Sequence, residues 1–265
     1  MQIIEWPQFL EKVLPSPSAI TIGVFDGVHR GHKALIECIV SWKDKAVPLV
    51  ITFRQSDHKK ARADGKKYPG DILSFRQKTA IFESLGVSVT IVIEFSESIK
   101  RMAGADFLSV LQKHGNMAFL AVGSNFRCGY RLDTDASAIQ EFNALRDIQT
   151  SIVPPLEECG APVSSSQIRA VIAGGDLKSA QAMLGYPFTV DLCGVSVFPA
   201  SGGGIAYDIS GRGCILPPPG SYDVFLAGEK GKKPATIKVE GGSIIISGDS
   251  TKEYNNPEYA EFIPR

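Results

Sequence analysis

Two of the four histidines in this 265-residue chain lie within four residues of each other, in the segment GVFDGVHRGH at residues 23–32. The segment follows an apolar run and opens a helical pattern, so its backbone N–H groups and the helix dipole favour an anion. The imidazoles of His29 and His32 occupy neighbouring positions on that helical turn. Gly31 between them leaves space for a ligand to approach the backbone. The chemistry predicted by this arrangement is phosphate binding.

Other interpretations of these histidines stay open. A lone histidine usually caps a helix or packs in a core, whereas a pair at this place favours function. A metal site is the weaker alternative, because imidazoles at this spacing have no cysteine or third histidine nearby. We therefore assign no metal ligand.

A second polar cluster lies far downstream, in VSSSQIR at residues 163–169. The hydroxyls of Ser164, Ser165 and Ser166 stand at the start of a helical pattern, where O–H and N–H donors face outward. Arg169 can add a guanidinium fork to a phosphate chain. A serine run before a helix is usually only an N-cap, but together with the histidine pair it indicates a second phosphate-binding element.

The elements that position these residues alternate along the chain. Nearly continuous apolar runs, typical of strands covered on both faces, occur at residues 19–25, 47–53, 87–95, 118–123 and 151–153. Helical patterns follow at residues 33–42, at 74–86 after a Ser74–Gln77 capping box, and around 107–111. The alternation predicts an α/β fold with a doubly wound parallel sheet, in which ligands bind beyond the carboxyl ends of the strands.

The composition changes near residue 186. The last 80 residues hold 12 of the 26 glycines and 8 of the 16 prolines, and short strand-like runs occur at residues 188–198, 221–226, 236–239 and 243–246. We predict two domains, an α/β domain at residues 1–185 and a small antiparallel β domain at residues 186–265.

Charge and cysteine content narrow the class of protein. Lys and Arg number 28 and Asp and Glu number 28, so there is no electrostatic footprint for nucleic acid or for an anionic membrane. Glu5 and Glu11 interrupt the N-terminal apolar residues, and no run approaches the ~18 residues of a membrane span. Five scattered cysteines fit reduced thiols rather than a disulfide framework. These features predict a cytoplasmic protein, and they carry no signal for its oligomeric state.

Four segments resemble motifs of one family, the prokaryotic FAD synthetases, within the wider H-x-G-H nucleotidyltransferases. The stretch TIGVFDGVHRGH is similar to the first family signature, and VSSSQIR resembles the I/V-S-S-T-x-I-R element that closes over the nucleotide phosphates. Residues 122–129, VGSNFRCG, are similar to a loop that lines the flavin site, and residues 176–188 resemble the junction to a second domain. The motifs stand in the family's order over residues ~20–198.

The resemblance implies transfer of AMP from ATP to FMN, giving FAD and pyrophosphate, with Mg²⁺ bridging the phosphate oxygens of ATP. It implies that His29 and His32 bind the ATP phosphates and stabilise developing charge, with Ser164, Ser165 and Arg169 on the β- and γ-phosphates. The remaining implied binding residues are Gly23, Phe25, Asp26 and Gly31 around adenine and ribose, Asn125 and Phe126 at the flavin, and Ser166 in place of the family threonine.

Two of these assignments keep a structural alternative. Asp26 has an equally plain interpretation as a buried structural carboxylate. Phe126 has one as the buried aromatic residue of a turn.

Two segments depart from the family pattern. Residues 52–58, TFRQSDH, lack both prolines of the T-F-x-P-H-P segment that helps to hold the FMN phosphate, where Arg54 or His58 could substitute. The loop at residues 54–71 carries six Lys and Arg against three Asp, which suits anionic substrates, although a solvated loop is the more common explanation of such a charge excess.

The C-terminal region resembles a reduced riboflavin kinase domain. The kinase stretch P-T-A-N is missing, residues 201–208 read SGGGIAYD instead, and the ~67 residues after Phe198 are few for a kinase domain. We therefore expect FAD formation without riboflavin phosphorylation. The rival functions are another phosphomonoester nucleotidyltransferase, such as a cytidylyltransferase, and a flavin- or nucleotide-binding protein that has lost turnover.

Overall fold

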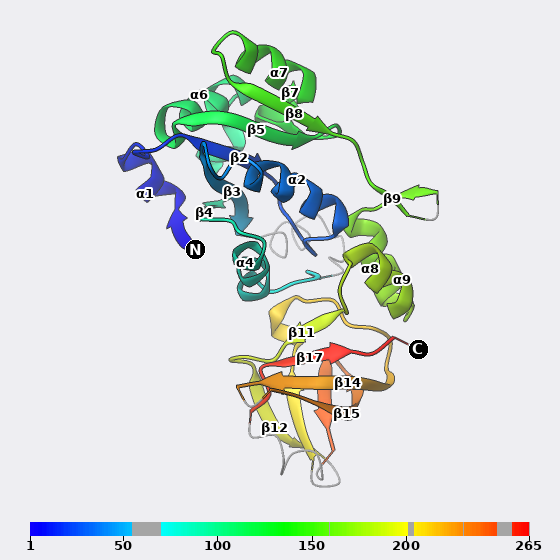
Figure 1. Ribbon diagram of the computed structural model, residues 1–265. Helices are drawn as coiled ribbons and strands as arrows, with labels where there is room; N and C mark the ends of the chain where they lie inside the picture. Colours follow the sequence, from blue (N-terminus) through cyan, green and yellow to red (C-terminus); the bar gives the residue numbers. More distant parts are fainter. Residues whose placement is uncertain (55–69, 159, 201–203, 230, 248–255, 265) are drawn as a thin grey trace. The chain divides into compact units, whose positions relative to one another are not determined.

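The computed structural model describes residues 1–54, 70–158, 160–200, 204–229, 231–247 and 256–264. The described chain forms two compact units (Figure 1). The first unit comprises residues 1–54 and 79–157, and the second comprises residues 70–78 and 158–264. The domain boundary predicted at residue 185 concerns functional modules and stays a prediction.

A six-stranded parallel sheet forms the centre of the first unit. Its strands are β1 (Gln2–Glu5), β2 (Ser18–Ile22), β3 (Val47–Arg54), β4 (Val89–Glu94), β5 (Met117–Gly123) and β8 (Gln149–Val153). Their order across the sheet is β1-β4-β3-β2-β5-β8, with every neighbouring pair parallel. The predicted doubly wound parallel sheet is confirmed.

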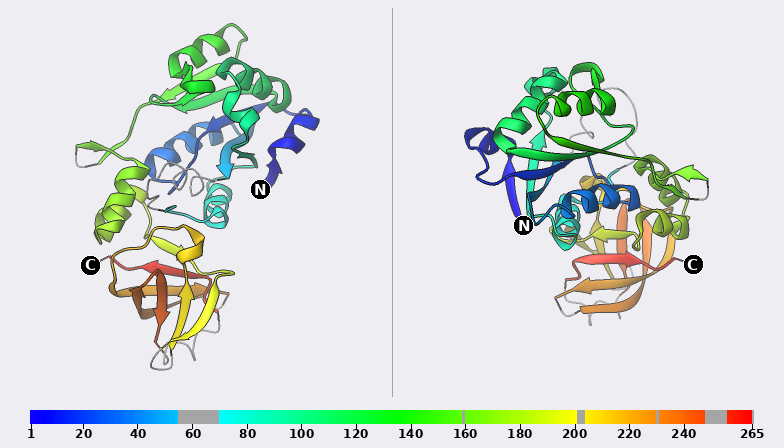
Figure 2. Two further views of the ribbon diagram at one scale, coloured as in Figure 1. Left: turned by 180° about the vertical axis from the view of Figure 1, so that it is seen from behind. Right: turned by 45° about the horizontal axis from the view of Figure 1, so that its top comes forward.

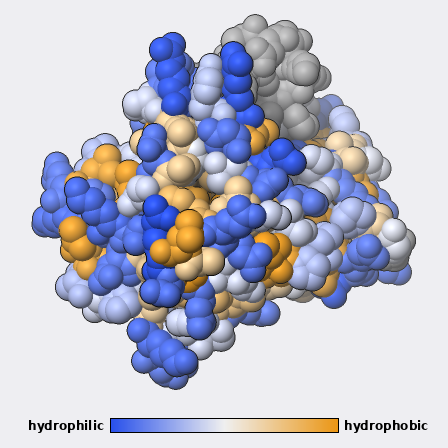
Figure 3. Space-filling model, turned by 90° about the horizontal axis from the view of Figure 1, so that it is seen from above, coloured by the Kyte–Doolittle hydropathy of each residue, from blue (hydrophilic) through white to orange (hydrophobic). Residues whose placement is uncertain are grey.

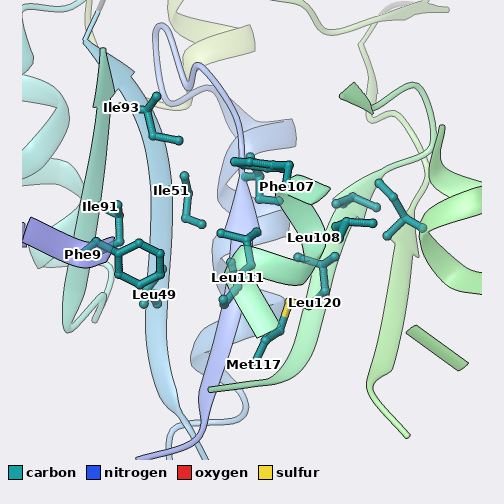
Figure 4. Packing of buried hydrophobic residues seen from close by; sticks show 14 of the residues in the cluster. Phe9, Leu49, Ile51, Ile91, Ile93, Phe107, Leu108, Leu111, Met117 and Leu120 are labelled. Carbon is teal, nitrogen blue, oxygen red and sulfur yellow. The ribbon is translucent and has the colours of Figure 1, made fainter. Parts of the chain in front are cut away.

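Helices cover both faces of this sheet (Figures 1 and 2). On one face, α1 (Trp6–Glu11), α6 (Gly104–Gly115) and α7 (Ala136–Ala144) pack on alternate strand residues such as Leu49, Ile51 and Ile91 (Figure 4). On the other face lies α2 (Arg30–Val40), which buries Ile36 and Ile39 and is followed by Trp42, stacked 4.5 Å from Phe119. Burial on both faces explains why the strands read as continuous apolar runs.

The strand order places a switch point between β2 and β5. From β2 the chain adds β3 and β4 toward one edge, and it later adds β5 and β8 toward the other. The loops after β2 and β5 therefore leave the same end of adjacent strands in opposite directions, which is where open α/β sheets bind ligands. Residues 23–29 and 124–126 are these two loops.

Two local features differ from the expectation, and one local expectation is confirmed. The strand expected at residues 19–25 ends at Ile22, because Phe25 adopts a left-handed backbone with φ 53°. The edge strand β1 and helix α1 were not expected, since four residues are too few to show a strand pattern. The capping box is confirmed: Gln77 Oε1 accepts the Ser74 N–H at 2.9 Å, ahead of α4 (Phe75–Ser84).

The second unit holds a seven-stranded antiparallel sheet and two helices. The strands are β11 (Thr189–Asp191), β12 (Ser196–Ala200), β13 (Gly204–Asp208), β14 (Gly220–Gly228), β15 (Gly231–Glu240), β16 (Ser243–Ile246) and β17 (Tyr259–Phe262), in the order β11-β17-β14-β15-β16-β13-β12. The helices are α8 (Ser165–Ala173) and α9 (Leu177–Leu184). Alternate residues such as Val224, Leu226 and Ile237 are buried, as expected for a sheet with one covered face.

The antiparallel β region is confirmed, with two differences in detail. The run expected at residues 188–198 is split into β11 and β12 by a turn that contains Gly194, whose φ is 67°. Strands β13 and β17 were not expected, because each is short and contains glycine or charged residues.

Smaller elements complete the described chain. They are α5 (Glu97–Arg101), β6 (Arg127–Cys128), β7 (Thr134–Asp135), β9 (Glu157–Glu158), β10 (Ala161–Pro162) and two short 3₁₀ turns at Tyr130–Leu132 and Ser210–Arg212. Cys38, Cys128, Cys193 and Cys214 are free thiols, and Cys159 lies outside the described residues. Among the helices described, none combines the length and apolar character needed to cross a membrane. The face in Figure 3 shows hydrophobic residues in small groups among hydrophilic ones.

Candidate active site

The two predicted histidines are in contact at the start of α2. Their rings stack with centroids 3.6 Å apart and planes 20° apart. His29 is the N-cap of the helix, and its Nδ1 accepts the backbone N–H of His32 at 3.4 Å. The imidazole of His29 therefore caps the N-terminus of the helix, and the imidazole of His32 stacks on it, in keeping with the neighbouring positions that their spacing predicted.

Burial sets the charge of His29, and a hydrogen bond sets its tautomer. His29 is only 6% exposed, and this desolvation lowers its pKa from 6.5 to about 4. At neutral pH the ring is uncharged, and because Nδ1 accepts a hydrogen bond, the proton is on Nε2. His29 is thus a neutral ring with Nε2–H as its donor, placed at the positive end of a helix.

The loop before the histidines has an unusual backbone. Phe25, Gly27 and Val28 all have positive φ, at 53°, 81° and 29°. For a β-branched residue such as Val28 this is a sterically costly conformation, of a kind that clusters at functional sites. Thr52 Oγ1 fixes the loop by donating to the Val24 carbonyl at 3.1 Å.

Packing rather than solvent surrounds Phe25. The ring is fully buried, edge-on to His32 at 5.1 Å and to Phe82 of α4 at 5.5 Å. The left-handed backbone turns Phe25 inward, and its ring packs against His32 and supports it from below. A direct contact of Phe25 with adenine stays a prediction.

Gly23 and Gly31 each lie against an aromatic ring that leaves little room for a side chain. A Cβ on Gly31 would lie 3.3 Å from Cε1 and Nδ1 of His29, and one on Gly23 would lie 3.1 Å from the Phe25 ring. Both positions therefore keep the aromatic rings in place by having no side chain. Asp26 between them is 4% exposed, which fits a structural carboxylate as well as a ribose contact.

The loop after β5 leaves the neighbouring strand. Ser124 N–H donates to the Val153 carbonyl and Phe126 N–H to the Gly123 carbonyl, each at 2.9 Å, forming a tight turn. Phe126 is half-buried against the sheet core, while Asn125 is exposed at the tip. The structure thus brings the two loops to adjacent strand ends, and their flavin contacts stay predictions.

The serine element lies in the second unit. Ser164 is the N-cap of α8, and its Oγ accepts the Gln167 N–H at 3.3 Å. Ser164 and Ser166 are exposed and Ser165 is partly exposed. The first turn of a nine-residue helix directs its N–H groups outward, as expected for an anion-binding end.

Arg169 lies one turn further along α8. Its Nε donates to the carbonyl of Gly70 at 2.9 Å, so the guanidinium direction is fixed by backbone. Gly70 was not expected to matter from sequence, where its only signal was the Pro69-Gly70 turn dipeptide.

The segment that departs from the family pattern is described only in part. Arg54 pairs with Glu5 at 2.5 Å and with Glu94 at 3.7 Å, so this guanidinium contributes to a surface ion-pair network. Gln55, Ser56, Asp57 and His58 lie outside the described residues, as does most of the basic loop. In the part of the chain that is described, no group of three or more His, Cys, Asp or Glu side chains is arranged for a metal ion.

The fold and the site define a class: an α/β protein with a switch point in its parallel sheet and an H-x-G-H pair at a helix N-terminus. The sequence model of the FAD synthetase family matches residues 11–167, which is more than half of the chain. The chain belongs to the FAD synthetase family.

Individual relatives agree with this family. The bifunctional riboflavin kinase/FMN adenylyltransferase of Escherichia coli (strain K12) is 27% identical over 192 residues, which cover 72% of this chain and 61% of that enzyme. The FAD synthetase of Listeria monocytogenes is 28% identical over 175 residues, covering 65% of this chain and 70% of the relative. The matched region thus spans less than two thirds of the bifunctional enzyme.

A solved structure supports the fold. The crystal structure described as a macrolide-efflux protein from Streptococcus pneumoniae superposes with a TM-score of 0.81 at 22% identity, covering 100% of this chain and 91% of the other. At this identity the likeness concerns the fold.

Proposed function

We propose that this protein is an FMN adenylyltransferase, which transfers AMP from ATP to FMN and releases pyrophosphate. The observation that carries the proposal is the stacked pair of buried His29 and partly buried His32 at the N-terminus of α2, beside the switch point of the sheet. Family membership supports the choice of substrates.

In the proposed reaction, an oxygen of the FMN phosphate attacks the α-phosphorus of ATP. A P–O bond forms to FMN, the bond to the β-phosphate oxygen breaks, and pyrophosphate leaves. The FMN phosphate is already anionic at pH 7, so no general base is needed. Catalysis then consists of positioning and of charge stabilisation, with Mg²⁺ entering as part of the ATP substrate.

The histidines have distinct tasks in this proposal. Neutral His29 donates through Nε2–H to a phosphate oxygen on which charge grows. His32 lies over it and is supported from behind by Phe25. Because the rings are held by stacking and by close glycines, these donors need no rearrangement as the charge develops.

The remaining assignments follow the family motifs. We assign Ser164, Ser165 and Arg169 to the β- and γ-phosphates of ATP, with Ser166 as a further nucleotide-binding residue in the place of the family threonine. Gly23, Asp26 and Gly31 are assigned to the adenosine part and Asn125 and Phe126 to the flavin. We also propose a cytoplasmic location, in keeping with the free thiols of the described cysteines.

We further propose that the C-terminal β region has no riboflavin kinase activity. The sequence has no P-T-A-N stretch, and Gly204–Asp208, within the segment that stands in its place, is an ordinary antiparallel strand, β13. Residues 201–203 of that segment lie outside the described residues.

One assay tests the proposed activity. Purified protein is incubated with Mg²⁺, with ATP or CTP, and with FMN, riboflavin or glycerol phosphate. Pyrophosphate release is measured, and the flavins are separated by chromatography. We expect FAD only from ATP with FMN. Product from CTP with another phosphomonoester would indicate a different nucleotidyltransferase, and tight FMN binding without pyrophosphate release would indicate a binding protein. FMN formed from riboflavin would disprove the absence of kinase activity.

A further inference from the structure

Residues 70–77 are joined to the β-sheet region within the second unit. Asp71 N–H donates to the Gly213 carbonyl at 2.7 Å, and Ile215 N–H donates to the Asp71 carbonyl at 2.9 Å. These two bonds form a short parallel bridge opposite Cys214. Backbone hydrogen bonds therefore attach the segment that leads into α4 to the chain between β13 and β14.

A charged network makes a second attachment. Arg76 binds Asp191 of β11 with two nitrogens, Nε to Oδ2 at 3.1 Å and Nη2 to Oδ1 at 2.7 Å. Its Nη1 donates to Glu258 at 2.6 Å, and the guanidinium lies 4.2 Å from the centre of the Tyr259 ring. Ser74 Oγ adds a bond to Asp191 at 2.6 Å. A bidentate pair to a buried carboxylate is a specific and strong contact.

Gly70 stands at the start of this attached segment, in a position that strongly favours glycine. Its φ of +107° is rarely adopted by residues with a side chain, and an added Cβ would lie 2.6 Å from both Cys214 C and Ile215 N. The same residue presents its carbonyl to Arg169 Nε at 2.9 Å. The backbone of residues 213–215 thus sets where this carbonyl lies.

We propose that Gly70 is a positioning residue for ATP binding: the C-terminal β region holds residues 70–77, and the Gly70 carbonyl fixes the direction of the Arg169 guanidinium. The inference rests on the proposed assignment of Arg169 to the ATP phosphates. It gives the C-terminal β region a part in adenylyl transfer that needs no chemistry of its own.

The test is a double-mutant cycle on the full-length chain with FMN and MgATP. Arg169→Ala, Gly70→Ala and the double variant are compared with Gly231→Ala. Gly231 is the matched control, because its φ is +95° and no described atom outside its chain neighbours lies within 4 Å of an added Cβ. Melting temperatures and FMN binding are measured for each variant, and the Arg169 Nε–H resonance is followed by NMR.

We expect Arg169→Ala and Gly70→Ala each to raise the KM for ATP about tenfold, with kcat within about twofold, because both remove an oriented guanidinium. The double variant should match Arg169→Ala, and the Nε–H resonance should shift in Gly70→Ala and stay in place in Gly231→Ala. If Gly70→Ala does not fold, Asp191→Asn replaces it in the cycle. It weakens the anchor without a steric clash, with a smaller rise of about threefold that also disappears in the Arg169→Ala background.

The outcomes separate this inference from the proposed function. An unchanged KM for ATP in Gly70→Ala beside a raised KM in Arg169→Ala overturns the inference alone, as do effects that multiply in the double variant. An unchanged KM in Arg169→Ala means that Arg169 does not bind ATP, and the inference falls with that assignment.

Discussion

Two helix N-termini carry the residues that we assign to the ATP phosphates, and they are built differently. Helix α2 begins with a buried imidazole, stacked on a second one and preceded by three residues with positive φ. Helix α8 begins with an exposed serine in ordinary extended backbone. Its charged group, Arg169, is half-exposed, and its Nε donates to the Gly70 carbonyl.

The difference suggests a division of labour. Donors that are fixed by packing before the substrate arrives stabilise charge that develops in the transition state. An exposed cap and a long guanidinium bind ground state and transition state alike, which lowers KM without raising kcat. We therefore expect changes at α2 to act on kcat and changes at α8 to act on KM.

The largest effect is expected from His29→Ala and His32→Ala. Each should lower kcat for FAD formation by ~10²-fold or more, because removal of one preorganised donor has costs of that size. FMN affinity, measured by flavin fluorescence, should change little. His114→Ala serves as the control, since His114 lies outside the site, with its Nδ1 beside the Lys12 carbonyl. Near-wild-type turnover in either site variant would remove the histidines from the mechanism.

Arg169→Ala should show the opposite pattern, with an effect on the KM for ATP rather than on kcat. Charge-assisted bonds to phosphate contribute about 1.5 to 3 kcal/mol, so the KM for ATP should rise roughly tenfold or more while kcat stays close to wild type. Steady-state kinetics at saturating FMN measure both parameters, and calorimetry measures FMN affinity. Loss of FMN binding instead would place the α8 element on the other substrate.

Burial of His29 also predicts a pH-dependent stability. The ring has a pKa of about 4 in the folded chain against 6.5 when exposed. As the pH falls below 6.5, the unfolded chain gains a proton that the folded chain does not bind until about pH 4, so folding loses stability over this window. The loss attributable to His29 should reach about 2 kcal/mol at pH 5.

Urea unfolding at pH 7.5 and pH 5 measures this loss. His29→Asn should lose about 2 kcal/mol less than wild type between the two pH values, and His114→Asn shows the effect of losing a histidine elsewhere. Equal losses in wild type and His29→Asn would mean that His29 is not held as a buried neutral ring.

The two helix N-termini also show what sequence can predict. The histidine pair and the serine cap were predictable because helix periodicity and capping are local. The central strands β2, β3, β4 and β5 of the parallel sheet were predictable because they are apolar on both faces. The inward turn of Phe25 onto Phe82 was not, since it depends on packing against a helix far along the chain. The Gly70 carbonyl under Arg169 was not either, because the two residues are 99 positions apart.

The smallest effect, and the sharpest test of α8, is expected from substitutions of Ser164. Ser164→Ala should lower the free energy of unfolding by about 1 kcal/mol, because the cap of the Gln167 N–H is lost. Ser164→Asp keeps a capping oxygen but adds negative charge where the ATP phosphates are assigned.

Ser164→Asp should therefore keep wild-type stability and raise the KM for ATP severalfold. Ser96 caps α5 in the same way, accepting the Ile99 N–H at 3.3 Å, so Ser96→Asp is the matched control and should leave the KM unchanged. If Ser164→Asp behaves like Ser96→Asp, Ser164 is only a helix cap. Arg169, Ser165 and Ser166 would then make the phosphate contacts of α8. The N-cap would bind substrate only at α2, which would increase the difference between the two helix N-termini.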